Sequence, residues 1–346
     1  MSSSVSVLRV LPRDRDKLDG LTGRIRVKLR ACSRSLGDLI DSYLHVGTGA
    51  LRLVVDENEL RRRATRAKTR RELEQLVQEL KESIQLDYAQ FVLLKEERAK
   101  ESPAVPGSSV KGNVRSRLEL SFVPKDGKIR CCLIRSTNSP LQPPPPGQHG
   151  WRHFRIWQRS LEFSRDGDEP CDYTGEETAG VCLLCDLFGT AGLAGLIEFS
   201  DLVGTGVNLV RVDLPTGEKL LAAPPASAFE GTVTFRILKP EELGLLLYGM
   251  GMRDSRLGRP VLLGKSKYRR YPRHVFGVVR YEVAALELAP ISQPLEAEAL
   301  RVQPGSKLEG PALDGVVRAL VAKARSAFDG ELLDVDEVGE LERLHA

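Results

Sequence analysis

Apolar and basic residues alternate strictly in the segment GRIRVKLR, residues 23–30. Successive side chains of a strand point to opposite faces, so Ile25, Val27 and Leu29 share one side of an extended chain. The opposite side consists of Arg24, Arg26, Lys28 and Arg30. The pattern predicts an amphipathic strand with one wholly basic face. Such a face suits phosphate groups, and an ordinary solvent-exposed sheet surface explains it equally well.

Residues 57–101 change to a helical pattern and contain neither glycine nor proline. Leucine and valine recur there at the spacing of one helix face, which predicts a helical insertion. Strand patterns return in GTVTFRIL and HVFGVVRYEVAALEL, and helical patterns in PEELGLLLYGM and GVVRALVAKARSAF. Because strands and helices recur in both halves, the chain is predicted to be α+β.

The motif PGSSVKGNVR predicts a helix start. Ser108 or Ser109 can cap a helix that begins at Val110. The free amides and positive dipole end of such a helix favour anions, and Lys111 and Arg115 add positive charge. A capped surface helix without a ligand is the alternative.

Composition narrows the class of protein only broadly. With 346 residues, 41% hydrophobic and 28% charged, the chain is typical of a soluble globular protein with two or three subdomains. Its net charge is only +4, so nucleic-acid binding would depend on local clusters of basic residues. The sequence shows no signal peptide and no apolar run long enough for a bilayer. We expect a cytoplasmic protein with no membrane partner.

The segment GRPVLLGKSKYRRY, residues 258–271, resembles a nucleotide-binding P-loop. A P-loop needs four residues between its glycines, a strand before it and a helix after it. Gly258 and Gly264 enclose five residues, and Pro272 opposes a following helix. A nucleotide-hydrolase function is therefore excluded.

Charge is the remaining signal of this segment. We call residues 250–280, which include it, the basic loop. Between Met250 and Arg280 nine basic residues face one acid, Asp254, and two tyrosines lie among them. Cations with interleaved aromatic rings favour contact with nucleic acid, and a solvated loop is the alternative. The candidate RNA-binding residues of the loop are Lys265, Lys267, Arg269 and Arg270.

Three of the six cysteines crowd into residues 171–185. Cys182 and Cys185 have zinc-ligand spacing, and Cys171 and a histidine can complete a tetrahedron. His153 is preferred over His149 because it lies in an apolar stretch. Four protein ligands predict a structural Zn²⁺ site. A redox CxxC is the alternative, and it would need a thioredoxin-like context that the sequence does not show.

Four motifs stand in a fixed order: LHVGTGALRLVVD, PAVPGSSVKGNVRSRLE, CLLCDLFGTAGLAGLIEFSDL and LLGKSKYRRYPRHVFGVV. Together they resemble the RAMP superfamily of CRISPR proteins, and in particular the repeating backbone subunit of type III interference complexes. The resemblance spans roughly residues 21–285. It implies a ferredoxin-like, RRM-type core with inserted domains. The implied division is a core of residues 20–56, 102–140 and 188–290, a helical insertion of 57–101, a zinc-binding insertion or lid of 141–187, and a C-terminal extension of 291–346.

The resemblance also implies function. Copies of the chain would polymerise along a CRISPR guide RNA beside other type III subunits, with the motif PGSSVKG and the basic loop on guide phosphates. An aspartate after the LHVGTG turn would cleave the paired target RNA with a divalent cation such as Mg²⁺, and Asp56 stands at that position. Asp56 as a helix cap is the rival interpretation. The alternative functions are a non-catalytic RNA scaffold and, third, an endoribonuclease that processes the CRISPR precursor.

Overall fold

The computed structural model describes residues 4–45, 57–67, 69–79, 102–133, 144–165, 170–174, 180–215, 217, 219–264, 266–297 and 300–345. Strands and helices alternate along these residues, so the predicted α+β class is confirmed. None of the described helices is long and apolar enough to cross a membrane.

An eight-stranded antiparallel sheet forms the centre of the molecule. Its path is β12 (Val261–Leu262), β14 (Val278–Leu288), β2 (Leu21–Ala31), β11 (Ala228–Leu238), β8 (Leu202–Val203) and β4 (Ala104–Val105), with β7 (Ile197–Phe199) on β11 and β17 (Lys307–Leu308) on β14. The predicted amphipathic strand is β2, at the middle of this sheet. Its apolar residues are buried, and Arg24 and Arg26 on the opposite face are exposed.

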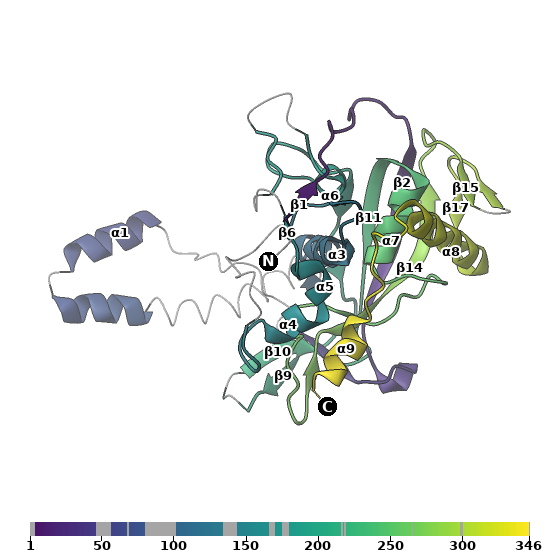
Figure 1. Cartoon of the computed structure of the whole chain (residues 1–346). Coiled ribbons are helices and arrows are strands. Elements are labelled where there is room, and N and C mark those ends of the chain that lie inside the picture. Colours follow the sequence, from purple (N-terminus) through teal and green to yellow (C-terminus); the bar gives the residue numbers. More distant parts are fainter. Residues whose placement is uncertain are drawn as a thin grey trace.

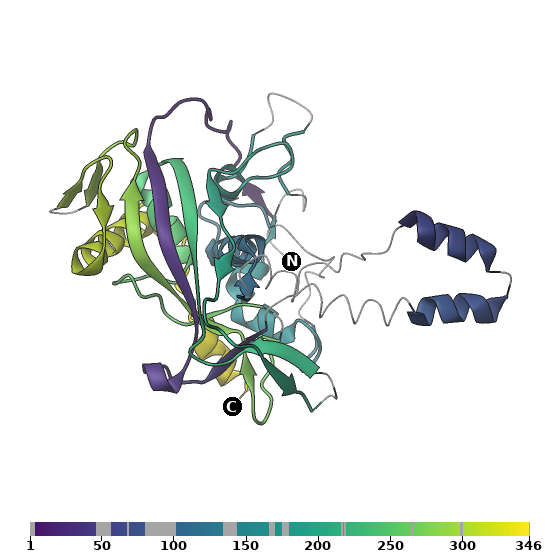
Figure 2. The same ribbon diagram turned by 180° about the vertical axis from the view of Figure 1, so that it is seen from behind.

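Three helices cover the apolar face of the sheet: α3 (Gly107–Ser121), α7 (Pro240–Gly249) and α8 (Gly310–Ala327) (Figure 1). The alternation of β2 explains this, because its buried row needs an apolar partner layer. Figure 2 shows the polar face of β14, β2 and β11 from the other side, where no described helix covers it.

Three smaller sheets flank the central one. One is β13 (Val275–Phe276), β3 (Ser42–His45), β10 (Lys219–Ala223) and β9 (Val210–Asp213); another is β5 (Lys128–Ile129), β1 (Ser4–Val7) and β6 (Ser164–Arg165); the last is β15 (Leu295–Ala297) and β16 (Leu300–Val302). The remaining helices are η1 (Arg34–Leu36), α4 (Trp151–Ile156), α5 (Gln158–Leu161), α6 (Leu183–Phe188) and α9 (Glu337–Arg343).

The predicted helical insertion contains α1 (Glu57–Arg66) and a second helix over 70–79. These two helices lie side by side, and Arg63 forms an ion pair with Glu79 between them (Figures 1 and 2). Asp56, the candidate catalytic residue, lies outside the described residues, as does Lys265 of the basic loop.

One helix boundary and one strand differ from the sequence-based expectation. Helix α3 begins at Gly107, with Pro106 at the N-cap, rather than at Val110 behind a serine cap. The segment HVFGVVRYEVAALEL is not one strand, because Gly277, with φ of 74°, separates β13 from β14. Glycine suits this left-handed conformation, and a Cβ atom at position 277 would lie 2.3 Å from the Leu263 carbonyl oxygen.

The acidic end of the chain folds back onto the body. Leu332 forms a bridge with Phe122 at the end of α3, and Leu333 donates its amide to the Ser121 carbonyl at 2.8 Å. Helix α9 then packs near α4 (Figure 1). We call residues 329–345 the C-terminal strap.

Candidate functional site

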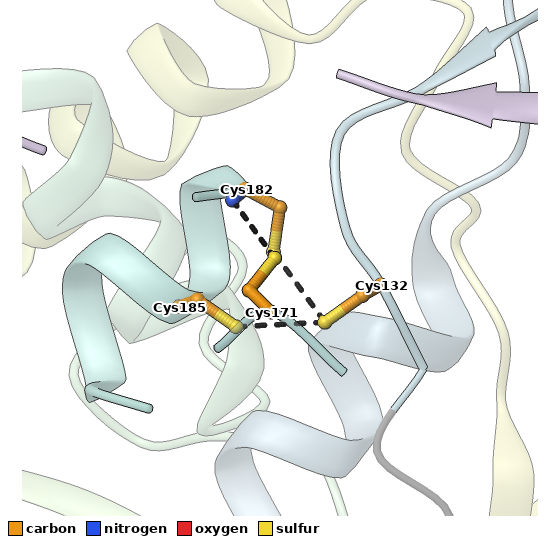
Figure 3. A group of neighbouring side chains, drawn as sticks. All are labelled: Cys132, Cys171, Cys182 and Cys185. Carbon is orange, nitrogen blue, oxygen red and sulfur yellow. Dashed lines mark hydrogen bonds between the residues drawn. The ribbon is translucent and has the colours of Figure 1, made fainter. Parts of the chain in front are cut away.

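Four buried cysteines meet in one cluster: Cys132, Cys171, Cys182 and Cys185 (Figure 3). Their sulfur atoms all lie within 4.8 Å of one another. Cys182 caps α6 and Cys185 lies within it, Cys171 is in the preceding loop, and Cys132 follows β5. The chain thus brings together three segments that are separate in sequence. We call these four residues the cysteine cluster.

The spacing within the cysteine cluster suits a tetrahedral metal ion. Cys132 Sγ lies 3.5 Å from Cys185 Sγ and 3.7 Å from Cys182 Sγ. Four sulfurs at a zinc–sulfur distance of about 2.3 Å stand about 3.8 Å apart in a tetrahedron. The donor set and its geometry therefore fit a divalent ion that prefers thiolate ligands.

The three predicted cysteine ligands lie together in this cluster, whereas His153, the predicted fourth ligand, lies outside it. His153 lies on α4, where its Nδ1 is 2.7 Å from the hydroxyl oxygen of Tyr268. Burial, followed by the charge of Lys267, lowers the pKa of His153 to about 4. The alternative, His149, is exposed in a turn. Cys132 takes the fourth place from outside the 141–187 segment.

Arg115 is engaged at the cysteine cluster rather than at a solvent-facing phosphate site. Its Nη2 donates to Cys185 Sγ at 3.1 Å, its Nη1 to the Gly189 carbonyl at 2.6 Å, and its Nε to Glu119 at 2.8 Å. Only 12% of the side chain is exposed. Hydrogen bonding with Cys132 lowers the pKa of Cys185 to about 7, and the charge of Arg115 acts in the same direction.

The start of α3 is fixed by the motif that contains FSD. The Gly107 amide donates to Asp201 Oδ1 at 2.8 Å. A Cβ atom at position 107 would lie 2.3 Å from the Phe199 carbonyl oxygen, so only glycine allows this approach. The second and third motifs of the sequence are therefore joined in space.

Beyond this joint, the first turn of α3 faces outward. Ser108 and Ser109 are exposed, and Lys111 is half-buried. Burial, and next the charge of Arg115, lower the pKa of Lys111. A Cβ atom at Gly112 would meet open space. Two hydroxyls, an ammonium group and an unobstructed backbone thus share one helix start, which is a suitable arrangement for an anion.

The basic loop leads away from α3. Asn113 Nδ2 donates to the Leu262 carbonyl at 2.8 Å, which links the helix to the loop's first strand, β12. Within the loop only part of the expected charge faces outward. Arg269 is exposed, whereas burial lowers the pKa of Lys267, whose Nζ lies 5.2 Å from the Tyr268 ring centre. Tyr268 is hydrogen-bonded to His153 and packs against its ring, with the ring centres 5.4 Å apart.

Most other cations of the loop are bound by acids that the local sequence does not show. Arg270 Nε donates to Glu342 of the strap at 2.8 Å. Arg253 and Arg259 both pair with Asp334, also in the strap. The side chain of Arg270 thus has a carboxylate partner and is 12% exposed, and its contact with RNA stays a prediction.

The polar face of the central sheet is a mixed surface. Arg24 donates to Glu287 of β14 at 2.6 Å, and Lys28 pairs with Glu230 of β11 at 2.9 Å. Arg26 lies between Thr232 and Ala285 on the neighbouring strands, and it is exposed. Of the two arginines predicted to bind RNA on this strand, Arg24 is paired with an acid, while Arg26 lies between uncharged strand neighbours and interacts electrostatically with Glu309.

Comparison with known proteins places these observations in a family. A family model described as "RAMP superfamily" matches residues 40–286. No curated protein matches. Among solved structures, Csc2 of Thermofilum pendens is 12% identical, with 97% of this chain and 85% of that chain covered and a TM-score of 0.33.

Two further structures are similar at the same distant level. Csm3 of Methanopyrus kandleri is 13% identical over 92% of this chain and 100% of that chain, with a TM-score of 0.32. A Csm3–Csm4 subcomplex of the type III-A CRISPR–Cas interference complex gives 14% identity, 78% and 79% coverage and a TM-score of 0.27. The family match covers most of the chain, including α3, the FSD motif and the basic loop, and the chain therefore belongs to the RAMP superfamily.

Proposed function

We propose that this protein is a guide-RNA-binding backbone subunit of a type III CRISPR interference complex. Membership of the RAMP superfamily and the four ordered motifs support this function. The observation that carries this proposal is the hydrogen bond from the Gly107 amide to Asp201. It fixes the start of α3, where Ser108, Ser109 and Lys111 lie together. Guide phosphates bind there and at Arg269 of the adjoining loop.

The core of the proposed subunit is ferredoxin-like. Its elements run β2, α3, β7, β11, α7 and β14 along the chain, and the corresponding strands lie in the order β14, β2, β11, β7. Strand–helix–strand units in that order, with both helices on one face, are those of the ferredoxin-like fold.

Recognition of the guide depends on its backbone rather than on its bases. In RRM domains, aromatic side chains on the sheet stack with bases. Here the polar face of β2, β11 and β14 carries arginine, lysine, glutamate and threonine, and their outward positions include no aromatic residue. Contacts with phosphates serve a subunit that binds guides of different sequence.

The cysteine cluster would hold a structural Zn²⁺. With four thiolate ligands the ion would have no open position for a substrate. Zinc would cross-link the segment after β5 to the loop before α6 and to α6 itself, and so stabilise a region that is poor in regular structure. We assign this metal no part in catalysis.

Cleavage of paired target RNA is the second part of the proposal. Asp56, which follows the LHVGTG motif, would orient a cation such as Mg²⁺ or the attacking hydroxyl. A scaffold that binds RNA without cutting it is the alternative, and Asp56 distinguishes the two. Asp56→Ala in an assembled complex abolishes metal-dependent cutting under the first function and changes nothing under the second.

The direct test of guide binding is sequencing of the RNA that copurifies with the native complex. We expect CRISPR repeat-derived guides in association with several copies of this chain. A random RNA population, or none, contradicts the proposed function. Precursor RNA cut by the isolated chain would favour the processing endonuclease instead.

A further inference from the structure

The arginine nearest the cysteine cluster has a role that the RNA-binding function does not require. Arg115 lies one helical turn after Lys111, yet its guanidinium turns inward to Cys185, Gly189 and Glu119. We infer that Arg115 is a positioning residue of the metal site. The inference rests on the metal site proposed above.

The contacts of Arg115 fix one ligand in place. Nη2 donates to Cys185 Sγ at 3.1 Å, while Nη1 donates at 2.6 Å to the carbonyl of Gly189, the residue that ends α6. The planar guanidinium of Arg115 therefore donates both to the Cys185 sulfur within α6 and to the Gly189 carbonyl at the end of α6. Because a guanidinium presents its donors in a rigid fork, it sets both the position and the direction of the Cys185 sulfur.

Glu119 in turn fixes Arg115. Its carboxylate accepts from Nε at 2.8 Å, one turn further along α3, and is only 3% exposed. The row of Glu119, Arg115 and Cys185 joins the helix of the RNA motif to the metal site. Partners of this kind around metal ligands orient them and tune the affinity for the metal.

Charge supports the same role. Four thiolates around a divalent ion leave a net charge of −2 in a buried place, and buried charge is costly unless it is paired. A guanidinium that donates to one of the sulfurs offsets part of that charge. Lysine could supply the charge, but it lacks the rigid fork of donors that contacts Cys185 and Gly189 together.

The test measures zinc affinity of the full-length chain without RNA, by competition with a chromophoric chelator. Arg115→Gln should weaken zinc binding about 10- to 100-fold, with Arg115→Lys in between. In Co²⁺-loaded protein, Arg115→Gln should also shift the sulfur-to-cobalt charge-transfer band, since one thiolate loses a hydrogen bond. The lysine variant supplies the result if the glutamine variant does not fold.

Arg253→Gln is the matched control. Arg253 is 14% exposed and also pairs with an acid, Asp334, but it does not contact a cysteine. Its loss should leave zinc affinity and the cobalt spectrum unchanged. Equal zinc affinity of the wild type and both Arg115 variants would overturn the inference, and so would equal losses in Arg253→Gln.

Failure of the inference can be told apart from failure of the proposed function. A wild-type chain that binds no zinc overturns both the metal site and the role of Arg115, while RNA copurification remains a separate result. A wild-type chain that binds zinc with no effect of Arg115 overturns the inference alone.

Discussion

Glu337 of α9 accepts a hydrogen bond from Arg117 of α3, with 2.9 Å between Nε and Oε1, and both side chains are buried. The same carboxylate oxygen accepts the Leu262 amide at 2.8 Å. The C-terminal strap is thereby fixed both to α3 and to β12, the first strand of the basic loop. One carboxylate unites three segments that lie far apart in the sequence.

Glu337→Gln should destabilise the protein by about 3–5 kcal/mol, because Arg117 keeps its buried charge without a counter-charge. Chemical denaturation at neutral pH measures the loss. Glu342→Gln is the control: Glu342 is 47% exposed and pairs with Arg270, so its loss should cost at most about 1 kcal/mol. Similar losses in the two variants would contradict the importance of the buried pair.

The two glycines of the PGSSVKG motif should respond in opposite ways to alanine. Gly107→Ala forces a Cβ against the Phe199 carbonyl and should lower the melting temperature markedly. Gly112→Ala adds a Cβ in open space within a helix, and should stabilise the free protein by about 0.5–1 kcal/mol. If the RNA backbone approaches Gly112 closely, the stabilised variant should nevertheless bind RNA more weakly.

The RNA footprint should depend on outward cations alone. Lys111→Gln and Arg269→Gln should each weaken binding and reduce the slope of log affinity against log salt by about 1. Arg270→Gln, which removes a cation already paired with Glu342, should leave that slope unchanged. Fluorescence anisotropy over a salt series gives the three values. A larger effect of Arg270 than of Arg269 would reverse our assignment of the loop.

Two adjacent cysteines provide a test of the metal site. Cys132→Ser should remove bound zinc, since Cys132 is one of the four clustered ligands. Cys131→Ser should retain it, because the Cys131 thiol instead approaches the Glu119 carbonyl. Elemental analysis after dialysis decides between them. His153→Gln should also retain zinc, and loss of the metal from that variant would restore the histidine to the ligand set.

Acid should destabilise the protein through His153. Burial lowers its pKa to about 4, below the ordinary value of 6.5, so the folded protein holds the ring neutral. Between pH 6.5 and 4 the unfolded chain binds a proton that the folded chain does not. Stability is therefore complete above pH 6.5 and is lost as the pH falls towards 4.

Denaturation curves at several pH values measure this slope. His153→Phe should lower stability at pH 7, because Tyr268 loses its hydrogen-bond partner, but it should flatten the profile between pH 4 and 6.5. His149→Gln, at an exposed position, is the control and should leave the profile unchanged. An equally steep profile in His153→Phe would assign the acid sensitivity to other groups.

Local patterns were sufficient where structure depends on neighbours in the sequence. The alternation of Ile25, Val27 and Leu29 predicted the buried side of β2, because strand geometry alone decides it. The helix at PGSSVKG was also predictable, although its start was placed three residues late. A serine cap is a local device, whereas the amide of Gly107 is satisfied by Asp201, 94 residues away.

The site residues that lie elsewhere than the sequence suggested share one physical cause, which is tertiary pairing. The spacing of Lys111 and Arg115 suggested one cationic face, but Arg115 turns towards a thiol 70 residues away. His153 was the nearest available ligand in the sequence, while Cys132 reaches the cluster from an earlier segment. The signal that could have identified Cys132 was the adjacent pair Cys131 and Cys132, in a chain whose other cysteines include three within residues 171–185.

The cations of the basic loop are synthesised before the acids that pair with them. Arg270 and Glu342 are separated by 72 residues, so at a synthesis rate of 5–20 residues per second the arginine emerges roughly 4–14 s before its carboxylate. Asp334 likewise follows Arg253 by 81 residues. During translation the loop is thus a strongly cationic nascent segment, and completion of the C-terminal strap supplies the carboxylates that pair with Arg253, Arg259 and Arg270.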